Sequence, residues 1–207
     1  MQAAPSLVPR FQYAHETADK FLMQLSVDRL PFRPDTALKD IGCKVYTYAE
    51  VAGHSHITTR DVAERFGSAE GCTFYRPGID EYLVFVNDVD PYIPRLRWTL
   101  THELSHIILH HLADNTADPL ENSSSLPLAN IEREADACAN ELLGPSSVLY
   151  TMGCLTASAI SETCVISHQA ATIKESFLSK CHGYRCNHTE TLLLSQFDTY
   201  VQGHMIA

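Results

Sequence analysis

The sequence predicts an α+β fold in which several helices pack on a small, mostly antiparallel sheet. Apolar residues recur at helical spacing in several segments, and three short segments are rich in strand-forming residues. A length of 207 residues suits one well-buried domain with a small appendage. The hydrophobic content of 45% and the charged content of 19% are typical of a globular protein.

Proline and glycine divide the amino-terminal half into short elements. Ala18, Phe21 and Leu22 have helical spacing, and Gly67 is placed to end a later helix. We expect His54 and His56 to lie in a loop. In chain order the sequence predicts a mobile lead-in at 1–13, helices at 14–27 and 35–40, a strand at 43–48, a helix at 59–66, and a hairpin of strands at 72–76 and 82–86.

The next predicted helix carries the most informative motif. His102, Glu103 and His106 form the pattern H-E-x-x-H, in which the two histidines lie one helical turn apart on the same face. Both imidazoles can therefore reach one metal ion, and Glu103 lies beside it, where it can take a proton from the water that the ion activates. The helix is apolar nearly all round, so we expect it to be mostly buried. Buried polar side chains need partners, and a bound cation supplies one.

A catalytic zinc site takes three protein ligands and leaves one position open, so a third ligand is expected downstream. Residues 131–145 are predicted to form a helix that ends at a Gly-Pro pair, with Glu141 projecting away from its apolar stripe. Glu132 and Asp136 lie one turn apart at the edge of that stripe. We expect Glu132 to be the ligand and Asp136 to accept the other N–H of a ligand histidine. Glu134, on the far side of the helix, is the alternative ligand.

These two segments resemble the metal-binding motifs of the ImmA/IrrE family of metallopeptidases. The family pattern is H-E-x-G-H followed by E-x-x-A-[N/D]-x-F-A-x-x-L-L-x-P, and the matching segments here are 102–106 and 132–145. Ser105 stands where glycine is usual and Cys138 where phenylalanine is usual, and neither is a ligand. The resemblance extends over residues 14–180.

The resemblance implies a zincin-like metallopeptidase core at 14–150, followed by a helical extension and tail at 151–207. Helices are expected in this extension at 157–163 and 167–178. In the family the extension is sometimes likened to a helix-turn-helix. Here it lacks a basic cluster, so we expect it to pack on the core or to hold a substrate and not to bind DNA.

The resemblance also implies an activity. Members of the family cleave helix-turn-helix transcriptional repressors and so relieve repression, in phages and other mobile elements or in response to DNA damage. By this resemblance the chain is a bacterial or phage endopeptidase that binds one Zn²⁺. His102, His106 and Glu132 are the implied ligands. Glu103 is the implied catalytic base. Mn²⁺ is an alternative, because two histidines and a carboxylate accept either ion.

Two other classes of function remain open. The chain can be a metal-binding regulatory or antitoxin-like module that holds a partner without cleaving it, although such a module has no need of the general base Glu103. A metal-dependent DNA-binding regulator is disfavoured by the net charge of −10, because phosphates would be repelled.

The chain shows no bilayer-length apolar run and no signal-peptide pattern, which predicts a cytoplasmic protein without membrane contact.

The remaining candidate residues have weaker signals. Seven cysteines in a chain without an export signal favour free thiols. A second zinc site in the tail is an alternative, although the spacing of the possible ligands matches no standard site. The possible ligands are Cys181, His182, Cys186 and His188.

Two supporting roles are also open at the sequence level. His110 lies one further turn along the metal face and is a candidate to support the ligands, whereas histidines in the positions of His110 and His111 most often cap or pack. A peptidase needs a donor to the oxyanion, and the sequence does not choose among Tyr150, His168 and Tyr184.

Overall fold

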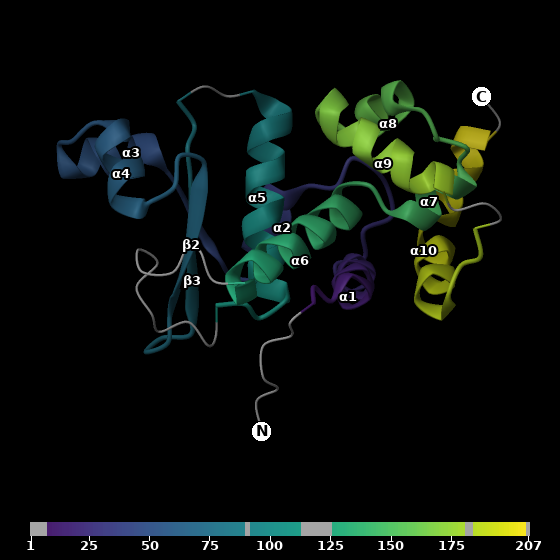
Figure 1. Cartoon of the computed structure of the whole chain (residues 1–207), viewed down its shortest axis with the longest axis horizontal. Helices are drawn as coiled ribbons and strands as arrows, with labels where there is room; N and C mark the ends of the chain where they lie inside the picture. Colours follow the sequence, from purple (N-terminus) through teal and green to yellow (C-terminus); the bar gives the residue numbers. More distant parts are fainter. Residues whose placement is uncertain (1–7, 90–91, 113–125, 181–183, 206–207) are drawn as a thin grey trace.

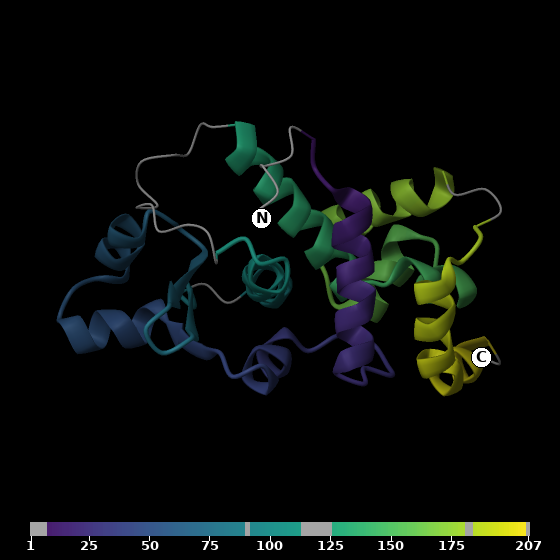
Figure 2. The same cartoon turned by 90° about the horizontal axis from the view of Figure 1, so that it is seen from below.

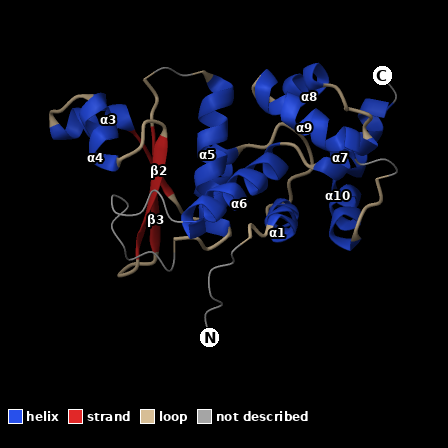
Figure 3. Ribbon diagram, viewed as in Figure 1, coloured by secondary structure: helices blue, strands red, loops and turns tan. Residues whose placement is uncertain are grey.

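The computed structural model describes residues 8–89, 92–112, 126–180 and 184–205. The α+β class is confirmed, because helices predominate and one small sheet lies among them (Figure 1, Figure 3). The elements in these residues are α1 (Phe11–Gln24), α2 (Pro34–Asp40), β1 (Lys44–Thr47), α3 (Tyr48–Ser55), α4 (Thr59–Phe66), β2 (Gly71–Arg76), β3 (Glu81–Val86), α5 (Ile93–Ile108), α6 (Leu126–Leu143), α7 (Ser146–Thr151), α8 (Ala157–Cys164), α9 (His168–Lys180) and α10 (His188–Met205).

The sheet has three strands in the order β1-β3-β2. β2 and β3 form the predicted antiparallel hairpin, in which Thr73 lies opposite Val84. On the other side of β3, β1 runs parallel to it, with Val45 opposite Val84. The sheet is therefore mixed, where the sequence led us to expect a mostly antiparallel one. The chain leaves β1 through α3 and α4 before it enters the hairpin, and such a crossover is what a parallel pair requires.

Helix α5 stands between the sheet and the helices α1, α6 and α7–α10, whereas α3 and α4 lie on the far side of the sheet (Figure 1, Figure 2). It contacts β2 and β3 on one side and α1, α2 and α6 on the others. Leu100, Leu104 and Ile107 of α5 are buried in the main hydrophobic core together with Leu142 of α6. The helix that carries the H-E-x-x-H motif is therefore held from several directions, as its apolar sequence predicted.

Helix α1 begins at Phe11, so the last three residues of the predicted lead-in are helical. The first seven residues lie outside the described part of the chain. Ala14, Ala18 and Leu22 are fully buried, and α1 packs on α6 and α10. Small side chains on this face suit a close approach between helices.

Three helices of the described residues were not predicted. α3 begins with a capping box, in which the Thr47 hydroxyl accepts from the backbone N–H of Glu50 and the Glu50 carboxylate accepts from that of Thr47. His54 consequently lies in a helix and not in the expected loop, and His56 ends the helix with a φ of 54°. The other two are the short α7, which follows Pro145, and α10.

Helix α10 forms in the tail for a similar reason. The Asn187 side chain accepts a hydrogen bond from the Glu190 N–H at 3.0 Å, and the Glu190 carboxylate accepts from the Asn187 N–H at 2.7 Å. Leu193, Phe197 and Val201, spaced four residues apart, are buried in the main core. This helix covers the side of α1 away from the sheet (Figure 2).

Glu141 of α6 is buried, and the expectation that it projects away was wrong. Its side chain is 2% exposed, and its carboxylate lies 2.7 Å from Lys174 Nζ and accepts from the Ser146 hydroxyl at 2.7 Å. Helix α9 brings Lys174 over the side of α6 that the sequence pattern assigned to solvent. An acidic residue off the apolar stripe faces water only when no other element covers it.

The predicted boundary at residue 150 does not separate two cores. Ile160 of α8, Ala171 of α9 and Phe197 of α10 belong to the same buried cluster as Leu22 of α1 and Leu104 of α5. The helical extension therefore packs on the preceding domain, as expected for a segment without a basic face. Within the described part of the chain, no helix combines the length and the apolar character that a membrane-spanning segment requires.

Candidate metal centre

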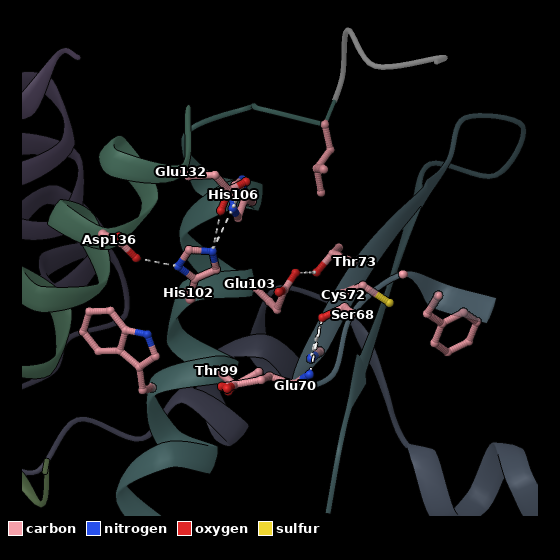
Figure 4. A pocket seen from close by; sticks show the side chains of 15 residues that line it. Ser68, Glu70, Cys72, Thr73, Thr99, His102, Glu103, His106, Glu132 and Asp136 are labelled. Atoms are coloured by element: carbon pink, nitrogen blue, oxygen red, sulfur yellow. Dashed lines mark hydrogen bonds and ion pairs between the residues drawn. The ribbon is translucent and has the colours of Figure 1, made fainter. Parts of the chain in front are cut away.

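Two histidines and a glutamate meet in a pocket between α5, α6 and β2 (Figure 4). His102 Nε2 lies 3.1 Å from His106 Nε2. The Glu132 carboxylate lies 3.2 Å from His102 Nε2 and 3.6 Å from His106 Nε2. Ligand atoms about 2.0–2.1 Å from a tetrahedral zinc ion are separated by about 3.3 Å. The three side chains are thus spaced as ligands of one small metal ion, and they can hold one.

Two hydroxyls of α5 near this site donate to carbonyls of the same helix. The Thr101 hydroxyl donates to the carbonyl of Arg97 at 2.7 Å, and the Ser105 hydroxyl donates to the carbonyl of Thr101 at 2.8 Å. Neither side chain competes for the histidines. The two imidazoles, one turn apart, are therefore free to face the pocket together.

The charges around His102 favour a cation. Burial opposes a positive charge on this ring, but hydrogen bonds with Asp136 and Glu132 outweigh it and raise the pKa of His102 to about 10. Hydrogen bonds with His102 and His106 hold the pKa of the Glu132 carboxyl well below its usual range, although burial acts against this. The site therefore has an ionised carboxylate facing two imidazole nitrogens, which suits a bound metal cation.

Asp136 lies where the sequence predicted it. Its Oδ1 lies 3.0 Å from Nδ1 of His102 (Figure 4). An ionised carboxylate only accepts, so Nδ1 carries a hydrogen and Nε2 of the same ring faces the pocket, where a bound metal ion would displace its proton and take the lone pair.

His111 sets the orientation and tautomer of His106, as Asp136 does for His102. The sequence did not single out His111 for this role. Its Nδ1 lies 3.2 Å from Nδ1 of His106, and its Nε2 lies 3.4 Å from Oε2 of Glu134. Because Glu134 accepts, Nε2 of His111 carries the hydrogen and its Nδ1 accepts from Nδ1–H of His106. His106 then also presents the lone pair of Nε2 to the pocket. Burial, with the neighbouring His106 second, lowers the pKa of His111 to about 4, in keeping with the neutral ring.

Glu134 is held away from the pocket. Its carboxylate accepts from the backbone N–H of Arg10 and from the Arg10 guanidinium, both at 2.8 Å. Burial opposes its charge, but the hydrogen bonds of Arg10 keep the pKa of Glu134 below its usual range. Of the two glutamates weighed as third ligand, Glu132 is the one that reaches the histidine nitrogens, and Glu134 lies behind His111.

His110, a candidate to support the metal ligands from one further turn of the helix, does not lie on the metal face. Helix α5 ends at Ile108, and His110 is exposed with a φ of 59°. The left-handed conformation at His110 turns the chain, and the turn brings His111 back onto His106. No glycine or proline marks this turn in the sequence, so the sequence pattern did not predict that the helix ends before His110.

Glu103 lies beside the three residues, on the side that faces β2. Its Oε2 accepts a hydrogen bond of 2.7 Å from the Thr73 hydroxyl, and the residue is 8% exposed (Figure 4). Cys72, the neighbour of Thr73 on β2, also lines the pocket. Burial, together with the charge of Glu103, raises the pKa of the Cys72 thiol to about 12, so this thiol stays protonated and is no nucleophile. The sequence indicated the strand but not which of its side chains meets α5.

The pocket has a volume of about 480 Å³ and is open to solvent. Tyr150, His168 and Tyr184, the candidates for an oxyanion donor, are absent from the described residues that line it. Tyr150 stacks on Tyr184 with ring centroids 5.1 Å apart, and the Tyr184 hydroxyl donates to Glu190. Ser68, Thr73 and Thr99 are among the polar residues that line the pocket.

The cysteine- and histidine-rich tail shows no second ligand cluster in its described part. Cys181 and His182 lie outside the described residues, while Cys186 is half-buried and His188 begins α10. Among the residues that the structure describes, His102, His106 and Glu132 form the only group of three or more side chains spaced to bind a metal.

Comparison with known proteins adds no name to this site. No protein-family model matches the chain, and no curated protein matches it.

Proposed function

We propose that the chain is a zinc-dependent endopeptidase. The observation that carries the proposal is the convergence of His102, His106 and Glu132 at separations of 3.1–3.6 Å. The carboxylate of Glu103 lies beside them in an open pocket. Three protein ligands and an accessible remaining position are characteristic of catalytic zinc sites.

Zinc bound by these residues would supply a Lewis acid that polarises the scissile carbonyl and activates water. Glu103 accepts a proton from the attacking water and delivers it to the leaving amine. The Thr73 hydroxyl holds Oε2 of that carboxylate and so leaves Oε1 for the water. Asp136 and His111 fix the two imidazoles in the tautomers that expose Nε2.

The substrate proposed is a helix-turn-helix transcriptional repressor, and cleavage relieves repression. This part of the proposal rests on the resemblance of segments 102–106 and 132–145 to the ImmA/IrrE pattern. Such a substrate would place the enzyme in the bacterial cytoplasm. No role in DNA binding is proposed, since the acidic net charge of −10 disfavours it.

The test compares wild type with Glu103→Gln, both loaded with zinc and incubated with the repressor encoded nearest to the gene. We expect cleavage by wild type and a loss of at least about 100-fold in the variant, because the amide cannot take up the proton. Glu64→Gln is the control, since this exposed glutamate forms an ion pair with Arg60 one helical turn away and does not line the metal pocket. Fragments are followed by mass spectrometry.

Two results would count against the proposal. Equal cleavage by wild type and Glu103→Gln would remove Glu103 from the mechanism. Zinc binding and tight repressor binding by both proteins, with no cleavage by either, would favour the regulatory or antitoxin-like module that holds its partner.

A further inference from the structure

A larger groove opens beside the candidate metal centre. It has a volume of about 780 Å³ and lies between the first turn of α1, the amino-terminal half of α5, the middle of α6, and α9. Phe11, Trp98, Ile173 and Phe177 contribute to its walls. The chemistry proposed above gives this groove no role.

The walls of this groove expose large apolar side chains. Ile173 is 62% exposed, Tyr92 is 56% exposed, and Phe11 and Phe177 are each 42% exposed. Ile173 and Phe177 lie one turn apart on α9, so they face the groove together. Contiguous exposed apolar surface of this kind marks binding sites in soluble proteins.

The groove adjoins the metal pocket. Glu70, Trp98 and Asp136 line both. Trp98 precedes His102 by four residues of α5, a rise of about 6 Å, which is about the length of two residues of extended chain. A polypeptide held at the metal centre would therefore enter the groove within about two or three residues.

The charges at the groove do not select a charged ligand. Arg95 forms an ion pair with Glu70, and the Arg133 guanidinium lies 5.2 Å from the centre of the Phe11 ring. Both signs of charge are present, and each basic group has a neighbour within the protein. Recognition in the groove therefore depends on apolar contact.

We infer that this groove binds bulky apolar side chains of the polypeptide substrate, within about three residues of the cleaved bond. The inference rests on the endopeptidase proposed above. It names the substrate class as polypeptides with an accessible segment that carries large apolar residues beside the scissile bond. A second copy of this chain fits less well, because a bulky protein seated over Trp98 and Asp136 would obstruct the metal pocket that shares them.

Trp98 allows binding to be measured without cleavage, since it is the one tryptophan in the sequence. We would titrate zinc-loaded Glu103→Gln with a ten-residue peptide whose two central residues are leucine, and with a twin that has serine at both positions. Trp98 fluorescence would report the binding. We expect the leucine peptide to bind at least about tenfold more tightly, because it alone can bury large apolar side chains.

A pair of matched variants assigns the preference to the groove. In the Glu103→Gln background, Ile173→Asp places a charge in the groove and should abolish the preference for leucine. Leu192→Asp places the same charge at a residue of α10 that is 48% exposed and does not line the groove, and it should leave the preference intact. Circular dichroism and thermal unfolding would verify that both variants are folded.

The outcomes separate this inference from the proposed activity. Equal binding of the two peptides, or an unchanged preference in Ile173→Asp, would overturn the groove assignment even if wild type cleaves peptides. Loss of the leucine preference in Ile173→Asp, with the preference kept in Leu192→Asp, would support the groove assignment. If wild type cleaved neither the peptides nor the repressor in that case, the peptidase proposal would fail while the groove assignment stood. Preferential cleavage beside apolar residues in a mixed peptide library would support both.

Discussion

At the scale of single residues, the site depends on hydrogen bonds that set which nitrogen of each histidine faces the pocket. Asp136 sets the tautomer of His102, as predicted from the one-turn spacing on α6. His111 sets the tautomer of His106 through Nδ1, and Glu134 in turn fixes His111. Arg10, just before α1, donates to Glu134 and is the last member of this chain of hydrogen bonds. Residues far from the H-E-x-x-H motif therefore determine how its histidines present their ligand atoms.

We expect His111→Phe to weaken zinc binding by about 10- to 100-fold, the usual effect of removing a partner that orients a ligand histidine. The phenyl ring fills the buried space but cannot accept the hydrogen of His106 Nδ1. Competition with a chromophoric chelator measures the zinc dissociation constant. His110→Asn is the adjacent control, because His110 is exposed and asparagine tolerates its φ of 59°. Unchanged zinc affinity in His111→Phe would contradict this role.

At the scale of elements, the sequence predicted those with a local signal. α5, α4 and the β2–β3 hairpin follow from apolar periodicity, a terminal glycine and a turn. α10 also has a local signal, a capping pair and the apolar stripe of Leu193, Phe197 and Val201. It was not predicted, because the cysteines and histidines before it were interpreted as possible metal ligands. The parallel pairing of β1 and the burial of Glu141 could not be predicted, because they depend on long-range crossovers that no local pattern encodes.

The packing of α1 against α6, α9 and α10 creates a second electrostatic feature. Asp19 of α1 is 2% exposed, and its Oδ1 finds no hydrogen-bond partner among the described residues. Burial, followed by the charges of Glu141 and Glu190, raises the pKa of Asp19 to about 8, while Lys174 acts in the opposite direction. The folded chain therefore keeps a proton that the unfolded chain, with a pKa of about 3.9, releases.

Asp19→Asn should therefore stabilise the fold more at high pH than at low pH. Between about pH 4 and pH 8 the unfolded state loses this proton before the folded state does, so the wild type loses stability as the pH rises. The amide does not titrate, and the gain should be small at pH 4.5 and largest at pH 8.5. Urea unfolding at both pH values measures it, with the exposed Asp40→Asn as control. An equal gain at both pH values would show that ionisation of Asp19 is not the cause.

At the scale of the whole molecule, the candidate centre joins segments that are distant in sequence. The contributors are Arg10 just before α1, the histidines on α5 with His111 after it, and Glu132 with Asp136 on α6. The unfolded chain does not hold these groups together, so a metal that binds them stabilises the folded state by mass action. The H-E-x-x-H motif and Glu132 could be predicted because their spacing is helical. Thr73, His111 and Arg10 could not, because tertiary packing brings them in.

The zinc content of the purified chain decides whether His102, His106 and Glu132 form a metal centre. We expect about one zinc per wild-type chain, near-complete loss of zinc in Glu132→Ala, and retention in Arg133→Ala, an exposed neighbour on α6 that lies off the metal pocket. Elemental analysis by mass spectrometry after dialysis gives these values. No zinc in wild type after reconstitution, or equal zinc in wild type and Glu132→Ala, would contradict a metal centre built from His102, His106 and Glu132.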